Sequence, residues 1–162
     1  MDPASLFRHH HMAVFRYLLR RTGDRGAAEE LMQETFVRVV RHADDYDERG
    51  HERAWLFGIA RNLATNWARG RERRPTEVLG ELGGDEHDAS AAMVLARLLA
   101  ALPELERELL LLREVAGLDY AEIAETTGLT IAAVRSRLFR ARAEARSLLT
   151  AETLPRTIGA RL

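Results

Sequence analysis

The chain has 162 residues, 46% of them hydrophobic, which suffices for one helical domain or two small ones. Its formal net charge is -1, which excludes a uniformly basic nucleic-acid coat, so any DNA contact must come from local patches. The chain contains no cysteine, no signal-peptide pattern after Met1 and no apolar stretch long enough to cross a membrane. We therefore expect a cytoplasmic protein without disulfides, bound metal, cofactor or direct membrane insertion.

Three helices are expected before residue 75. The first begins near Ser5 and ends at the turn formed by residues 22–24. The third runs from about His51 to Arg71, and Pro75 prevents its continuation. The helix between them has the apolar spacing of a buried stripe, and its expected inward residues are Leu31, Thr35, Phe36, Val39 and Val40.

The composition changes after the third helix. Residues 76–90 are rich in glycine and acidic side chains, and we expect a flexible acidic linker between two helical domains, residues 1–75 and 91–150. Helices are expected at about residues 91–101 and 104–115, separated by the stop at Leu102-Pro103. Residues 151–162 are expected to be a frayed tail. The predicted fold class is all-α, with three helices before the linker and four after it.

The stretch from Leu118 to Leu149 predicts two helices joined by a tight turn. Asp119 can cap the first helix, and Glu122 completes a capping box three residues later. Gly128 lies where that helix must end in a left-handed conformation, which glycine adopts at low cost. Thr130 can cap the longer, arginine-rich second helix. This arrangement resembles a helix-turn-helix with its recognition helix second.

The second helix of this pair has two contrasting faces. Its expected buried stripe comprises Ile131, Val134, Leu138, Ala141, Ala145 and Leu148. The opposite face starts with small residues and continues with arginines, which suits entry into a DNA groove. The candidate DNA contacts are Thr130, Ala132, Ala133, Arg135, Ser136, Arg137 and Arg140. The alternative is a helical hairpin with a solvated charged face, but the near-absence of acidic residues there favours nucleic acid.

These segments, in this order, resemble a bacterial sigma factor of the extracytoplasmic-function (ECF) group of the sigma-70 family. The similar segments are residues 23–25, 30–38, 49–50, 53–63, 101–107, 111–118, 120–124 and 134–142. The resemblance covers nearly everything from Leu6 to Leu149. It implies a protein containing sigma regions two and four, which directs core RNA polymerase to promoters and helps to open them. An anti-sigma factor would control it, and the catalysis would belong to the polymerase.

The resemblance also implies roles for particular residues. The loop and third helix would recognise and melt the minus-ten element, with Asn62 lining a pocket for an unstacked base. Further candidates for this contact are Arg53, Asn66, Arg69 and Arg73. The helix-turn-helix would bind the minus-thirty-five element, and the second domain would meet the flap of the polymerase's second subunit. The outward face that would dock on the clamp helices of the largest subunit comprises Glu30, Gln33, Glu34 and Arg38.

Each of these roles has a simpler alternative, because the docking face can be a plain solvated surface and Asn62 a structural hydrogen-bonding residue. Three positions also depart from the family pattern. Glu52 replaces a common aromatic residue, Val40 a frequent tryptophan, and Ala132-Ala133 a usual Gly-Thr pair. The last change removes a hydroxyl that could bond DNA, so the family's promoter preference does not transfer to this chain.

Other functional classes have less support. His9, His10 and His11 are consecutive, so on a helix they point about 100° apart and cannot chelate one ion well. The sequence contains no glycine-rich phosphate loop and no nucleophile elbow, so we do not expect an enzyme. The main alternative is a free-standing helix-turn-helix regulator that binds DNA without polymerase. Its first domain would then hold a ligand pocket or a dimerisation surface.

Overall fold

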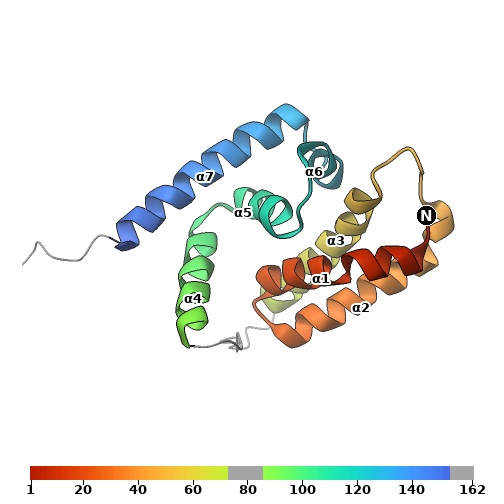
Figure 1. Cartoon of the computed structure of the whole chain (residues 1–162), viewed down its shortest axis with the longest axis horizontal. Helices are drawn as coiled ribbons and strands as arrows, with labels where there is room; N and C mark the ends of the chain where they lie inside the picture. Colours follow the sequence, from red (N-terminus) through yellow and green to blue (C-terminus); the bar gives the residue numbers. More distant parts are fainter. Residues whose placement is uncertain (73–85, 154–162) are drawn as a thin grey trace, which may run out of the picture.

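The computed structural model describes residues 1–72 and 86–153, and within these ranges every regular element is a helix (Figure 1). The predicted all-α fold class is confirmed. The N-terminal helices are α1 (Pro3–Thr22), α2 (Arg25–Arg41) and α3 (Glu52–Glu72). The C-terminal helices are α4 (Glu86–Ala101), α5 (Glu104–Leu110), α6 (Tyr120–Thr127) and α7 (Ile131–Thr153). A 3-10 turn at Ala43–Asp45 follows α2, and a π-helical turn at Leu111–Val115 follows α5.

The N-terminal helices form a bundle. Asp2 caps α1 by accepting hydrogen bonds from the backbone N–H groups of Ala4 and Ser5, each at 3.1 Å. Asp24 caps α2 in the same way, accepting from the N–H of Ala27 at 3.0 Å. Because the connection between α1 and α2 is so short, the two helices form an antiparallel hairpin (Figure 1). The bundle buries Leu6, Val14, Tyr17, Leu18, Phe36, Val39, Leu56 and Phe57.

The ends of two helices and one side chain of α2 differ from the sequence prediction. Helix α4 begins at Glu86, earlier than the expected start at about residue 91. Residues 86–90 of the expected linker are therefore helical, and its residues 76–85 lie outside the described residues. Helix α7 continues to Thr153, since residues 150–153 offer no glycine or proline to stop it. Val40 is 64% exposed rather than inward, because it lies about 100° around α2 from the buried Val39.

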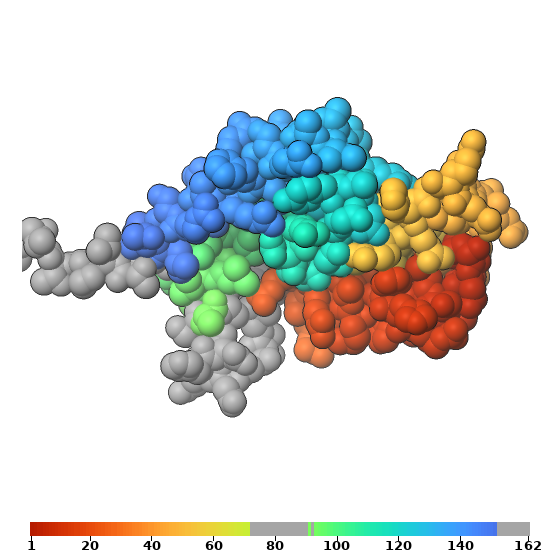
Figure 2. All heavy atoms as spheres, turned by 45° about the horizontal axis from the view of Figure 1, so that its top comes forward, coloured from red at the N-terminus to blue at the C-terminus, as the bar shows by residue number. Residues whose placement is uncertain are grey.

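The N-terminal and C-terminal helices pack directly against each other. Helix α6 lies on α3, and the π-helical turn after α5 lies against α1. Figure 2 shows the segment containing α5 and α6 seated directly on α1. The buried apolar residues of both halves belong to one continuous cluster, which extends from Leu6 to Ala141. None of the helices in the described part of the chain is long and apolar enough to cross a lipid bilayer.

Candidate nucleic-acid interface

Helices α6 and α7 form the predicted helix-turn-helix. The Asp119 carboxylate accepts from the N–H of Glu122 at 2.8 Å, and the Glu122 carboxylate accepts from the N–H of Asp119 at 2.8 Å. Gly128 ends α6 in the left-handed region, with φ 75°. The Thr130 hydroxyl accepts from the N–H of Ala133 at 3.1 Å, so it caps α7 as expected. These three hydrogen bonds and the left-handed Gly128 fix the ends of the two helices at the turn.

The buried stripe of α7 begins later in the helix than the sequence predicts. Val134, Leu138 and Ala141 are fully or almost fully buried, which confirms the centre of the expected stripe. Ile131 is 47% exposed, so its expected burial is wrong. As the first residue of α7 it lies beyond the core and lines a shallow pocket with Tyr120 and other residues of α6.

The outward side of α7 presents a mixed polar surface. Its exposed residues include five of the predicted DNA contacts, Thr130, Ala132, Arg135, Ser136 and Arg140, and Ala133 is half-buried. The guanidinium of Arg135 lies 6.0 Å from the centre of the Tyr120 ring, within cation–π range, so α6 helps to orient it. Within the described residues, Arg140 has no hydrogen-bonding or ion-pairing partner and extends into solvent.

Arg137 does not lie free on this surface. Its guanidinium pairs with the Glu106 carboxylate of α5 at 2.8 Å, and the side chain keeps only about a third of its possible exposure. Arg142 makes a similar pair with Glu114 at 2.7 Å. These two pairs attach α7 to α5 and to the π-helical turn that follows α5. The structure thus gives Arg137 a bracing contact that its place on the helical face did not predict.

Phe139 is an outward residue that the sequence analysis missed. It is 71% exposed, the highest value among the large apolar side chains of the described residues. It lies beside Arg140, Arg135 and Ser136 on the outward side of α7. The signal was present in the sequence, because the stripe of Val134, Leu138 and Ala141 leaves position 139 outside the core. An exposed aromatic ring on a recognition helix can make apolar contacts in the major groove, for example with a thymine methyl group.

A second polar surface lies on α3. Asn62, Asn66 and Arg69 recur at spacings of four and three, so they share one face of the helix, and all three are exposed. Two amides and one guanidinium in a row can bond base edges and a phosphate. Arg73, the remaining candidate on this segment, lies outside the described residues.

Arg53, at the start of α3, is separated from that face and engaged elsewhere. Its guanidinium donates to the carbonyl oxygen of Gly117, in the segment before α6. Its Nε lies 3.6 Å from the Glu122 carboxylate of α6. The structure therefore does not bring Arg53 together with Asn62, Asn66 and Arg69. It places Arg53 in the contact between the two halves of the chain.

The expected docking face on α2 lies on the molecular surface. Glu30 and Gln33 are exposed, whereas Glu34 and Arg38 are half-buried and form an ion pair at 2.9 Å. Val37 and Val40 are 41% and 64% exposed on the same helix, and the sequence analysis did not include them in this face. Val40 borders a shallow pocket with Phe7 and Phe36. The face thus combines charged groups with an apolar centre.

The three consecutive histidines are held by different contacts. His9 Nδ1 lies 2.8 Å from the carbonyl oxygen of Ser5, and His11 Nδ1 lies 2.9 Å from that of Phe7. His10 turns towards α3 and α6, where burial and the charge of Arg53 lower its pKa. Among the described residues, no group of three or more histidines and carboxylates could hold a metal ion.

Comparison with known families matches both halves of the chain. Residues 6–74 match the family model of Sigma-70 region 2. Residues 92–144 match that of Sigma-70, region 4, which includes α6 and α7 as far as residue 144. The two matches fall on the N-terminal and C-terminal helices. Together with the surfaces on α3 and α7, they define a two-part, all-helical transcription factor.

Individual relatives and solved structures agree with this class. The chain is 33% identical over 143 residues to the ECF RNA polymerase sigma factor SigM of Bacillus subtilis, covering 83% of this chain and 87% of SigM. It is 34% identical over 155 residues to SigE of Mycolicibacterium smegmatis, covering 89% of this chain but 60% of SigE. A solved structure of CnrH in complex with the cytosolic domain of CnrY superposes with TM-score 0.75 at 26% identity, covering 93% of this chain and 89% of CnrH.

The chain therefore belongs to the ECF group of sigma-70 family RNA polymerase sigma factors. As a sigma factor it acts with core RNA polymerase and promoter DNA in transcription initiation. The resemblance inferred from the sequence is confirmed.

Proposed function

We propose that this sigma factor binds promoter DNA at two places. Helix α7 binds the minus-thirty-five element, and α3 with its preceding loop binds the minus-ten element. The observation that supports this most strongly is the presence of two exposed donor faces on two separate helices. One comprises Arg135, Ser136 and Arg140, and the other Asn62, Asn66 and Arg69. Because a duplex must be both recognised and opened, two faces with different chemistry suit the two tasks.

The face on α7 suits the major groove of duplex DNA. Small residues at Ala132 and Ser136 allow close approach of the helix backbone to the groove floor. Arg140 can donate two parallel hydrogen bonds to a guanine edge, and Phe139 can contact a thymine methyl group. Arg137 acts indirectly, since its pairing with Glu106 holds α7 at its angle to α5.

The face on α3 suits separated strands. The Asn62 amide offers a donor and an acceptor, which can pair with the exposed edge of an unstacked base. Arg69, two turns further along, can neutralise a phosphate of the same strand. Asn66 lies between them on the same face. We propose Arg53 and Arg73 as further contacts, and Arg53 must first leave its contact with Gly117.

We further propose that α2 docks on the clamp helices of the polymerase's largest subunit. Glu30, Gln33, Glu34 and Arg38 provide its polar rim, while Val37 and Val40 provide the apolar centre that stable interfaces usually contain. The C-terminal helices would meet the flap of the second subunit. This chain would supply no catalytic group and would act in the cytoplasm. Control by an anti-sigma factor is proposed too, in line with CnrH, which was solved bound to the cytosolic domain of CnrY.

Binding of labelled promoter DNA with and without core polymerase separates this proposal from a free-standing regulator. We expect weak binding by the chain alone and tight, opened complexes only when core polymerase is present. Equally tight binding to duplex promoter DNA without core polymerase would favour the free-standing regulator instead.

A further inference from the structure

A cavity of about 310 Å³ lies between α1, α3, α4 and α5. Part of its wall is apolar and consists of Leu19, Leu99 and Leu111, with Ala68 of α3 beside them. Leu19 and Leu99 are partly buried and pack against the hydrophobic core, so this part of the wall is firmly held. Pockets that hold small molecules begin at about 300 Å³. The cavity is therefore large enough for a small ligand with an apolar part.

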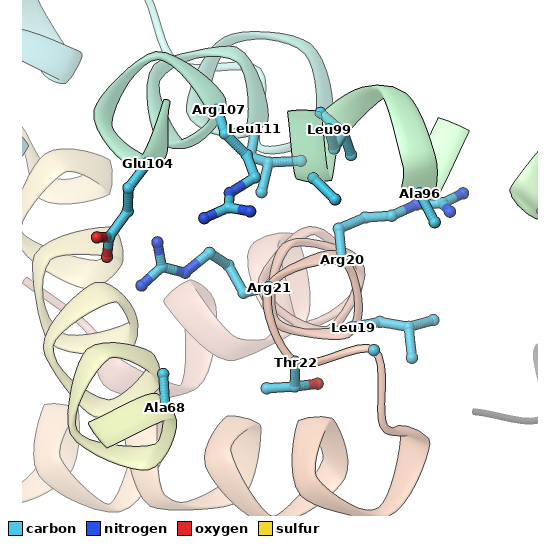
Figure 3. A pocket seen from close by; sticks show the side chains of 12 residues that line it. Leu19, Arg20, Arg21, Thr22, Ala68, Ala96, Leu99, Glu104, Arg107 and Leu111 are labelled. Carbon is cyan, nitrogen blue, oxygen red and sulfur yellow. The ribbon is translucent and has the colours of Figure 1, made fainter. Parts of the chain in front are cut away.

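Three arginines and one carboxylate also line this cavity. Arg20 and Arg21 come from the last turn of α1, whereas Arg107 and the acid, Glu104, come from α5. Figure 3 shows the guanidinium groups of Arg21 and Arg107 pointing towards the same space. Within the described part of the chain, Glu104 forms no ion pair with any of the three arginines. The lining thus carries an excess of two positive charges.

Arg107 has a position that no internal contact explains. It is half-buried, yet no residue in the described ranges bonds or pairs with its guanidinium. A guanidinium that is partly removed from water gains free energy when it finds an acceptor. Arg107 does not compensate a free helix end either, because α5 continues into the π-helical turn, where the N–H of Leu111 donates to the carbonyl oxygen of Arg107. Its donors are therefore available to an acceptor that enters the cavity.

Arg21 differs from Arg107 because it is held in place by neighbouring side chains. Its own side chain is only 9% exposed, and it lies 3.4 Å from the Glu108 carboxylate and donates to Thr65 at 3.1 Å. A guanidinium has five N–H donors, so some remain for a second acceptor. Arg20 is exposed, and it too pairs with none of the described residues. One fixed and two unpaired guanidinium groups around one cavity suit an oxyanion.

We propose that this cavity binds a phosphate monoester with a small apolar body, and that Arg21 and Arg107 hold its phosphate. A phosphate monoester carries about two negative charges at neutral pH, which matches the excess charge of the lining. A carboxylate carries only one. The leucine wall contacts the remainder of the ligand. Because the lining comes from the parts of the chain that match both sigma regions, the ligand contacts both.

This site is separate from the proposed promoter contacts, because none of the residues assigned to DNA or to the polymerase clamp lines the cavity. Loss of promoter recognition would therefore leave the binding of a phosphate monoester unchanged. Conversely, a chain that binds no phosphate monoester could still direct transcription with core polymerase. The two proposals thus fail in different experiments.

Isothermal titration calorimetry of the full chain with phenyl phosphate tests the site. Arg107→Gln should weaken binding about tenfold, because it removes charged donors to the phosphate. Arg97→Gln is the matched control and should leave binding unchanged, since Arg97 is exposed on the adjacent helix α4 and lies outside the lining. Glu104→Gln should tighten binding, because Glu104 is the only acid among the described residues of the lining. Circular dichroism melting checks that each variant is folded.

Two further ligands test what the cavity recognises. Inorganic phosphate should bind more weakly than phenyl phosphate because it lacks the apolar body, and benzoate should bind more weakly because it carries one charge. Ala96→Leu, which narrows the cavity, should lower the affinity for phenyl phosphate towards that for inorganic phosphate. No measurable binding of phenyl phosphate, or an equal effect of Arg107→Gln and Arg97→Gln, would overturn the site. Benzoate binding as tight as that of phenyl phosphate would overturn the assignment to a phosphate monoester.

Discussion

Glu108 and Arg61, separated by 47 positions in the sequence, form a 2.8 Å ion pair that joins α5 to α3. Arg61 lies in the part of the chain that matches sigma region 2, and Glu108 lies in the part that matches region 4. The Tyr17 hydroxyl donates to the same Glu108 carboxylate. Burial raises the pKa of Tyr17 well above its usual range, so the hydroxyl stays protonated and remains a donor. The pair shows that the helices of regions two and four form one assembly in this structure, in which a promoter-binding candidate, Arg53, is also engaged.

Arg140→Ala should weaken binding to the minus-thirty-five element by about 1–3 kcal/mol if the side chain contacts a base. The reason is that Arg140 is exposed and unpaired among the described residues, so removing it costs no internal contact. Fluorescence anisotropy with duplexes carrying each base at each position measures the loss. Arg146→Ala, which changes an exposed arginine six residues further along α7, is the control and should leave base discrimination unchanged. A uniform loss across all sequences would assign Arg140 to a phosphate.

Phe139→Ala should reduce binding to the same element without lowering thermal stability. Phe139 is 71% exposed, so its truncation leaves no cavity. Leu138→Ala, at the fully buried neighbouring position, should instead lower the free energy of unfolding by about 2–5 kcal/mol. Chemical denaturation and DNA binding of the two variants separate the effects. A large stability loss in Phe139→Ala would place the ring in the core.

Asn62→Ala should impair promoter opening more than it impairs closed-complex binding. An amide that pairs with an unstacked base contributes only after the strands separate. Permanganate footprinting of unpaired thymines measures opening, and a competition assay at low temperature measures the closed complex. Equal losses in both assays would contradict a role in base capture.

The contact between His51, just before α3, and Glu125 of α6, at 2.6 Å, should weaken as pH rises above about 6.5. The hydrogen bond to Glu125 raises the pKa of His51, with Glu122 and Asp119 of the same region adding to the effect. A raised pKa means that protonated His51 stabilises the folded arrangement in which α3 contacts α6, fully at low pH and less as pH rises through the raised pKa. The free energy of unfolding, measured by chemical denaturation at a series of pH values, should therefore contain a contribution that falls as pH rises, and His51→Gln should abolish that contribution.

His10 requires its own control in that titration. Burial and Arg53 lower the pKa of His10, so protonation of His10 at low pH would destabilise the folded chain. This effect on stability has the opposite sign to that of His51. The charges of Glu52 and Glu122 act in the opposite direction and raise the pKa of His10. A pH response that survives in His51→Gln but disappears in His10→Gln would contradict the assignment to His51.

Local features of this fold could be predicted from the sequence, because they depend on neighbouring residues. The capping box of Asp119 and Glu122, the left-handed Gly128 and the Thr130 cap each involve positions within three residues of one another. The order of the helices followed from apolar spacing and the stop at Pro103. Family resemblance supplied the functional class.

Contacts between distant segments could not be predicted in this way. Glu108 follows a helical pattern that gives no sign of burial, and its partners Tyr17 and Arg61 lie in the other half of the chain. Arg137 shares the outward face by periodicity, yet α5 places Glu106 beside it. Ile131 and Val40 fit apolar stripes, but each lies at the margin of its packed surface.

Run-off transcription with purified core polymerase over a library of genomic promoter fragments tests the central claim most directly. We predict transcripts from a defined subset of fragments only when this chain is added. Within that subset, Arg140→Ala should alter the selection of promoters and Asn62→Ala should lower the yield. The account would be contradicted if no transcript depended on the chain while it still bound the same fragments equally well without core polymerase.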